Sequence, residues 1–179
     1  MSHPLAQRLA APAPSSINSG LSPARPATLR RLLGEPRADY TSQCQAVTNP
    51  SIARRLVTRD VGPFRVTGLD VAVSSLLRVM ALVRQHRPDA YDVIGTAGML
   101  CARLVRGSQS TPSNHSWGTA IDLTFAGRLD PLGDGTVQQG LLAVYPYFHR
   151  EGWFWGAEFR REDGMHFELA DETIRRLLA

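Results

Sequence analysis

The chain has 179 residues, 43% of them hydrophobic, and a formal net charge of +4. This length suits a single domain with a sizeable core, and the apolar content is ordinary for a globular protein. No apolar run approaches the roughly 20 residues that a membrane-spanning helix needs, so we expect no membrane span.

All 20 basic residues are arginines. The arginine pairs, such as Arg30-Arg31 and Arg175-Arg176, are scattered along the chain, and no aromatic stripe lies between them. Nucleic-acid interfaces usually combine these two features, so we expect no nucleic-acid partner.

Residues 1–26 are rich in Ala, Pro and Ser, which predicts a disordered or extended tail before a single domain over residues 27–179. Leu9-Ala10-Ala11 is interrupted by Pro12 before an apolar segment forms, so we expect no signal peptide. Residues 28–33 and 51–56 are typical of short helices, and residues 64–68 of a strand and turn.

The strongest helix prediction covers residues 70–86, where Leu76, Val79, Met80 and Val83 recur at helical spacing. Further along, we expect strands at 91–94 and 119–125, a turn at 95–98, a loop at 126–136, and helices at 137–148 and 172–178. This irregular order of helices and short strands predicts an α+β fold, with a small antiparallel sheet packed by helices.

Cys44 and Cys101 are the only cysteines. Two cysteines allow one disulfide without demanding it, and the apolar surroundings of Cys101 also suit a buried free thiol. The sequence leaves both alternatives open.

Two distant segments, residues 113–122 and 163–168, supply the chemistry. His115, Asp122 and His166 offer two nitrogens and one oxygen, a donor set that suits zinc better than calcium or magnesium. Asp163 is placed to act as the general base that such a site needs. The residues alone leave a second interpretation open, in which both histidines are ordinary loop or core residues.

On a strand, His166 and Glu168 would share one side while Phe167 enters the core. Glu168 would then be able to orient an imidazole. Trp153 and Trp155 have the same spacing, and we expect Trp155, next to Gly156, either to line the site or to pack in the core.

The pattern Ser113-x-His115, Gly118-x-Ala120-x-Asp122 and Asp163-x-x-His166 resembles the zinc D-Ala-D-Ala carboxypeptidase family. That family also includes D-Ala-D-Ala dipeptidases and phage L-alanyl-D-glutamate endopeptidases. The likeness covers residues 60–170 and implies an α+β fold with a single zinc site in a cleft on the sheet.

The resemblance implies one zinc ion per chain, bound by His115, Asp122 and His166, with Asp163 as the base. It implies that Arg103 binds a substrate carboxylate or carbonyl, with Arg106 as the competing candidate. Ser113 would donate a hydrogen bond to the substrate. The position of Trp155 before Gly156 and the loop to Asp163, and not the resemblance, predicts that it lines the cleft and contacts the substrate.

The implied activity is hydrolysis of peptidoglycan stem peptides in the cell wall or periplasm, most simply as a D-Ala-D-Ala carboxypeptidase. An L-alanyl-D-glutamate endopeptidase and a catalytically idle, zinc-stabilised wall-binding module are the alternatives. The scissile bond, the oligomeric state and the export route stay open.

Overall fold

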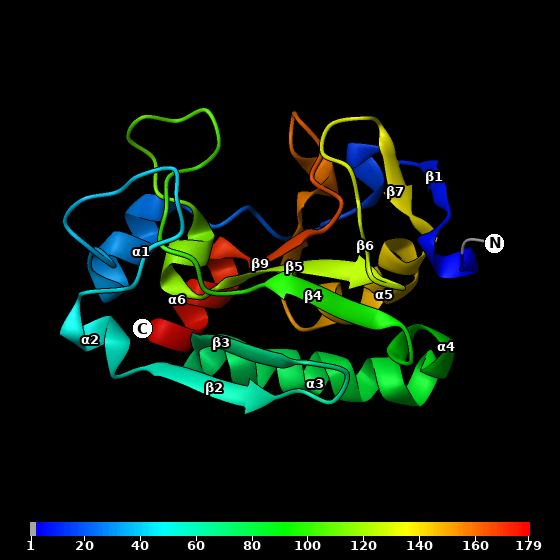
Figure 1. Cartoon of the computed structure of the whole chain (residues 1–179), viewed down its shortest axis with the longest axis horizontal. Helices are drawn as coiled ribbons and strands as arrows, with labels where there is room; N and C mark the ends of the chain where they lie inside the picture. Colours follow the sequence, from blue (N-terminus) through cyan, green and yellow to red (C-terminus); the bar gives the residue numbers. More distant parts are fainter. Residues whose placement is uncertain (1–2) are drawn as a thin grey trace.

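The computed structural model describes residues 3–179, and within them the largest sheet has five antiparallel strands (Figure 1). Its order is β4–β5–β9–β8, with β6 paired to β5. The strands are β4 (Ile94–Gly98), β5 (Ala120–Phe125), β6 (Arg128–Leu129), β8 (Trp153–Trp155) and β9 (His166–Leu169). Two-stranded sheets form from β1 (Arg8–Ala10) with β7 (Thr136–Gln138) and from β2 (Leu56–Asp60) with β3 (Arg65–Leu69).

Helices α3 (Asp70–His86) and α5 (Gln139–Arg150) pack against each other and provide most of the helical core (Figure 1). The shorter helices are α1 (Pro26–Leu33), α2 (Pro50–Ala53), α4 (Pro88–Tyr91) and α6 (Asp171–Leu178). The mixture of helices with small antiparallel sheets confirms the predicted α+β class.

The main sheet has one core face and one face that is free to carry a site. On β5, Ile121, Leu123 and Phe125 are fully buried, whereas Asp122 between them is half-buried. On β9, the ring of Phe167 packs 4.3 Å from that of Phe148 in α5. Because side chains alternate along a strand, the residues next to these core positions point to the opposite face.

Helix α3 has the bounds that its periodicity predicts, but the predicted strand at residues 91–94 is wrong. Pro88 restarts a helix over Pro88–Tyr91, where its missing N–H is not needed. The strand begins at Ile94 and runs through the predicted turn to Gly98. A Cβ on Gly95 would lie 2.7 Å from Oγ1 of Thr124, so this glycine permits close pairing of β4 with β5.

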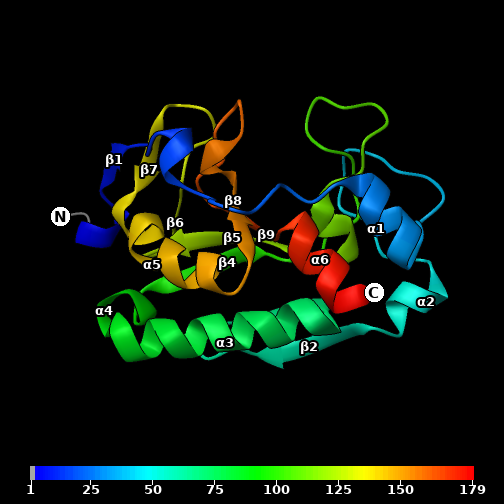
Figure 2. The ribbon, with the colours of Figure 1, turned by 180° about the vertical axis from the view of Figure 1, so that it is seen from behind.

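The N-terminal segment, predicted as a disordered or extended tail, is extended over much of its described length and packs onto the domain. Strand β1 pairs with β7, and Leu5, Ile17 and Ala24 are buried in the core cluster. The first two residues of the predicted tail lie outside the described residues. Figure 2 shows the segment crossing β8 and β9 to reach α1. In residues 3–179, no helix is both long and apolar enough to cross a bilayer.

Candidate metal centre and cleft

Strand pairing brings Asp122 and His166 together. They are directly opposite each other in the antiparallel register of β5 and β9. Residues opposite each other in such a ladder share one face, and this is the face turned away from Phe167 and the core. Their separation of 44 positions in sequence therefore does not separate them in space.

His115 reaches the same place from a 3-10 helix, Asn114–Trp117, that ends at Gly118. Gly118 has φ +66°, in the left-handed region that favours glycine. A Cβ there would lie 2.7 Å from the backbone N of Leu69, so the turn also depends on a close backbone contact with β3. This turn directs the chain from His115 into β5.

The three predicted ligands converge. Nε2 of His115 lies 3.2 Å from Nδ1 of His166 and 3.2 Å from Oδ1 of Asp122, and the latter two atoms are 3.1 Å apart. A tetrahedral ion with ligand distances of roughly 2.0 Å has ligand–ligand edges of about 3.3 Å. The spacing of the three atoms therefore fits one zinc-sized ion with an open fourth position.

The second nitrogen of each histidine is already bound. Nδ1 of His115 lies 3.0 Å from the carbonyl of Met99, and Nε2 of His166 lies 2.8 Å from Oε2 of Glu168. Both contacts require a ring N–H, which leaves the lone pair of the other nitrogen directed at the cluster. Three acceptors facing one another need a cation, and the predicted orienting role of Glu168 fits this geometry.

The pKa values reflect the same concentration of acceptors. Burial by itself would lower the pKa of His166, but its hydrogen bonds to Asp122 and Glu168 raise it to about 10. Burial opposes ionisation of Asp122, yet the hydrogen bonds to His115 and His166 keep the pKa of its carboxyl well below the ordinary value. The cluster therefore binds positive charge strongly, as a proton or as a metal ion.

Asp163 lies at the edge of this cluster. Its Oδ1 is buried, and no described group is its hydrogen-bond partner. Burial raises the pKa of Asp163, and the charge of Asp122 adds to this against the opposing effects of the two histidines and Arg106. A carboxylate with an unused acceptor and a raised pKa is suited to exchange a proton with a group in the cleft.

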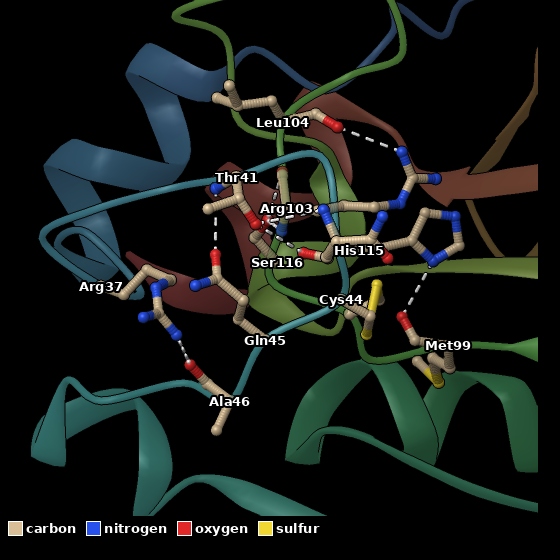
Figure 3. The surroundings of a disulfide bond; sticks show 12 residues. Arg37, Thr41, Cys44, Gln45, Ala46, Met99, Arg103, Leu104, His115 and Ser116 are labelled. Atoms are coloured by element: carbon tan, nitrogen blue, oxygen red, sulfur yellow. Dashed lines mark hydrogen bonds between the residues drawn. A yellow bond between two sulfur atoms is a disulfide. The ribbon is translucent and has the colours of Figure 1, made fainter.

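These residues line a cleft of about 410 Å³, which also includes Arg103, Arg106 and Ser113. The guanidinium of Arg103 donates from Nη1 to the carbonyl of Leu104, 3.1 Å away, and its backbone is bonded to Ser116 (Figure 3). Arg106 is exposed, and its positive charge acts to lower the pKa of Asp163. Both arginines thus have access to a ligand in the cleft.

Ser113 is 6% exposed and lines the same cleft beside His115. It occupies the N-cap position of the 3-10 helix, where its hydroxyl caps no described backbone group. This position leaves its predicted hydrogen bond to substrate geometrically open.

The predicted contact between Trp155 and substrate is wrong. Trp155 is fully buried, is not part of the cleft lining, and donates from Nε1 to the carbonyl of Gly164. It is opposite Phe167 in the register of β8 and β9, and their rings stack 5.7 Å apart. Because paired residues share a face, Trp155 belongs to the core.

Several residues of the cleft were not predicted from the sequence. Pro23, Ala24 and Pro26 form part of its lining, as do Asn114 and Arg161. The N-terminal residues belong to a stretch whose composition indicates only an extended chain, so their position depends entirely on tertiary contacts.

The disulfide between Cys44 and Cys101 lies next to the centre (Figure 3). The N–H of Cys101 donates to the carbonyl of His115, 3.0 Å away. Cys44 belongs to the loop before α2, and the adjacent Gln45 forms a bridge with Ala102. The cross-link thus joins this loop to the segment that contains both Met99 and Arg103.

Comparison with known proteins supports the same chemistry. A family model described as D-alanyl-D-alanine carboxypeptidase matches residues 106–169, which confirms the predicted resemblance. The matched range contains His115, Asp122, Asp163 and His166, and begins after Arg103. The match indicates a metallopeptidase with a peptide-type substrate. No curated protein matches the chain.

Proposed function

We propose that the protein is a zinc-dependent peptidase that hydrolyses peptidoglycan stem peptides, most simply as a D-Ala-D-Ala carboxypeptidase. The observation on which this rests is the convergence of Nε2 of His115, Nδ1 of His166 and Oδ1 of Asp122 beside the unpartnered carboxylate of Asp163. An ion-binding site used only for stability has no need of that fourth group.

The division of labour follows from the positions of the residues. His115, Asp122 and His166 would hold one zinc ion, which supplies a water of lowered pKa and an electrophile for the substrate carbonyl. Asp163 would accept a proton from the attacking water and return it to the leaving amine. Arg103, with Arg106 as the alternative, binds a carboxylate or carbonyl of the substrate, and Ser113 donates a hydrogen bond to it.

The test is digestion of purified muropeptides with zinc-loaded protein, followed by mass spectrometry of the products. We expect loss of a terminal D-Ala, abolished by a chelator and restored by zinc. The Asp163→Asn variant should keep one zinc per chain and lose about 10²- to 10⁴-fold in turnover, as expected for a missing acid–base group. Asp92→Asn, which changes an exposed aspartate of the same charge, is the matched control.

The other outcomes separate the alternatives. A cut stem that keeps its terminal D-Ala would establish endopeptidase action, such as cleavage between L-Ala and D-Glu. Stoichiometric zinc binding without cleavage of any stem peptide would contradict the proposed enzyme and favour a wall-binding module.

A further inference from the structure

Residues 18–26, which we name the strap, cross the molecule next to the metal centre (Figure 2). Asn18 anchors the start of the strap: its Oδ1 accepts from the backbone N of Trp155, 2.8 Å away, and its Nδ2 donates to the carbonyl of Trp155 and to Glu158. Asn18 is 3% exposed, so this anchor is part of the folded interior.

A second anchor follows four residues later. The backbone N–H of Ser22 donates to Oε2 of Glu172, and its carbonyl accepts from the backbone N–H of Asp171, 3.0 Å away. Both partners belong to the first turn of α6. The strap is therefore attached on both sides of the centre, to β8 and to α6.

Between its attachment to α6 at Ser22 and the start of α1, the strap contacts Glu168, the residue that orients a proposed metal ligand. The backbone N–H of Ala24 donates to Oε1 of Glu168, 2.7 Å away. Nδ2 of Asn114 donates to Oε2 of Glu168 at 2.8 Å and to the carbonyl of Ala24 at 3.2 Å. Oε2 of Glu168 also contacts Nε2 of His166.

Glu168 is 2% exposed, and no arginine among the described residues pairs with it. Its buried carboxylate is therefore stabilised by the N–H of Ala24, the amide of Asn114 and the imidazole of His166. A buried carboxylate that loses one of these donors is destabilised and can rotate toward another donor. His166 would then lose the hydrogen bond that fixes its tautomer and orientation.

The strap also forms a wall of the cleft. Pro23, Ala24 and Pro26 line it together with His166 and Asp163. Both prolines lack an N–H and have restricted backbone angles, so the Ala24 N–H lies in a stretch of low conformational freedom. This arrangement presents one fixed donor to Glu168.

We propose that the strap is a positioning element of the active site: through the Ala24 N–H it fixes Glu168, and through Glu168 it sets the orientation of His166 and the affinity of the centre for zinc. This proposal rests on the proposed zinc site, and extends the functional unit to residues that lie outside the match at 106–169. Its consequence is measured as metal affinity, independently of any hydrolysis.

The experiment is a double-mutant cycle between Ala24→Pro and Glu168→Gln, read out as the zinc dissociation constant from competition with a chromophoric chelator. Ala24→Pro removes the donor N–H and adds a ring that restricts the local backbone, and Ala24→Gly keeps the N–H as the control. We expect Ala24→Pro to weaken zinc binding about 10- to 100-fold, as for loss of a group that orients a ligand, and Ala24→Gly to change it less than about threefold.

In the Glu168→Gln background, Ala24→Pro should change zinc affinity by less than about threefold. An amide in place of the Glu168 carboxylate cannot accept hydrogen bonds at both ends, so the link from Ala24 to His166 is already broken. An equal loss in both backgrounds, or wild-type affinity in Ala24→Pro, would overturn the proposal. The visible spectrum of the cobalt-substituted protein should differ between Ala24→Pro and Ala24→Gly if the ligand geometry changes.

Thermal unfolding of the metal-free variants shows whether each one folds. Should Ala24→Pro fail to fold, Asn114→Leu tests the same carboxylate from its other side, with the same cycle and the same expected non-additivity. Failure of the peptidase proposal would be recognised separately, as wild-type protein that binds zinc tightly and cleaves no stem peptide.

Discussion

His115 and His166 meet at one cluster, but the groups that accept hydrogen bonds from their second nitrogens differ in charge. His115 is bonded to the neutral backbone carbonyl of Met99, in a segment cross-linked by Cys44–Cys101. His166 is bonded to the buried carboxylate of Glu168, which depends on the strap.

This difference gives the two halves of the site different sensitivities. The carbonyl and the disulfide on the His115 side do not titrate near neutral pH. The His166 side includes a second buried carboxylate, Asp130, which lies against Gly164 in the turn before His166. Reductant should therefore act mainly through one half and pH through the other.

The largest effect is expected from removal of the disulfide. Its cysteines are 57 residues apart, and a closed loop of this length stabilises a fold by about 4 kcal/mol in the chain-entropy model. The Cys44→Ser/Cys101→Ser variant should lose about that much free energy of unfolding, measured in urea. Reductant should lower the midpoint of the wild type and leave the variant unchanged; equal midpoints for both proteins without reductant would contradict the prediction.

A glycine pair tests the turns of the two halves. A Cβ on Gly118 would meet backbone atoms of Gly68 and Leu69, which cannot move aside, and the residue has a positive φ. A Cβ on Gly164 would meet only the side chains of Asp130 and Val137. We expect Gly118→Ala to reduce the free energy of unfolding by about 2–4 kcal/mol and Gly164→Ala by about 1–2 kcal/mol.

The prediction is tested by comparing these two losses of unfolding free energy, measured by urea unfolding at one pH. Gly127→Ala, at a glycine with φ +71° and no atom within 4 Å of its added Cβ, reports the cost of the left-handed backbone alone. A Gly118→Ala loss no greater than that of Gly127→Ala would show that the close contact with β3 is unimportant.

The third test is the pH dependence due to Asp130. Burial, together with the charges of Glu162 and Asp134, raises its pKa to about 7 against the Gln138 N–H and Arg8. The folded state thus binds this proton more tightly than the unfolded state does. The stabilisation is fully present below about pH 4, the ordinary pKa of an aspartate, and is lost as pH rises through about 7.

Asp130→Asn should therefore become more stable relative to wild type between pH 5 and pH 8. Urea midpoints at each pH measure the change, and Asp92→Asn, at an exposed site, should follow the wild type. Parallel pH profiles for Asp130→Asn and the wild type would show that Asp130 is ionised throughout this range.

The parts predicted from the sequence are those that depend on local pattern. Helix α3 follows from its periodicity, and the alternation along β9 places His166 and Glu168 on one face and Phe167 on the other. The three predicted ligands have short, specific surroundings in the sequence, which is why the cluster could be predicted.

The remaining parts depend on partners that are distant in sequence. The sequence spacing of Trp155 is compatible with either face of the sheet. Its pairing with Phe167 places it on the core face. The two cysteines are brought together by the backbone bridge between Gln45 and Ala102, a contact that the sequence alone does not indicate. The role of the strap comes from one backbone N–H of Ala24, and side-chain patterns contain no information about such a donor.

The strap also has a consequence for the order of folding. Ala24 and Glu168 are 144 residues apart, and Arg8 pairs with Gln138 across a similar distance. Contacts of such long range form slowly, because the entropy of closing the intervening loop is lost before the contact stabilises the chain. Metal binding should therefore follow the collapse of the chain, and an ion added during refolding should slow unfolding more than it speeds folding.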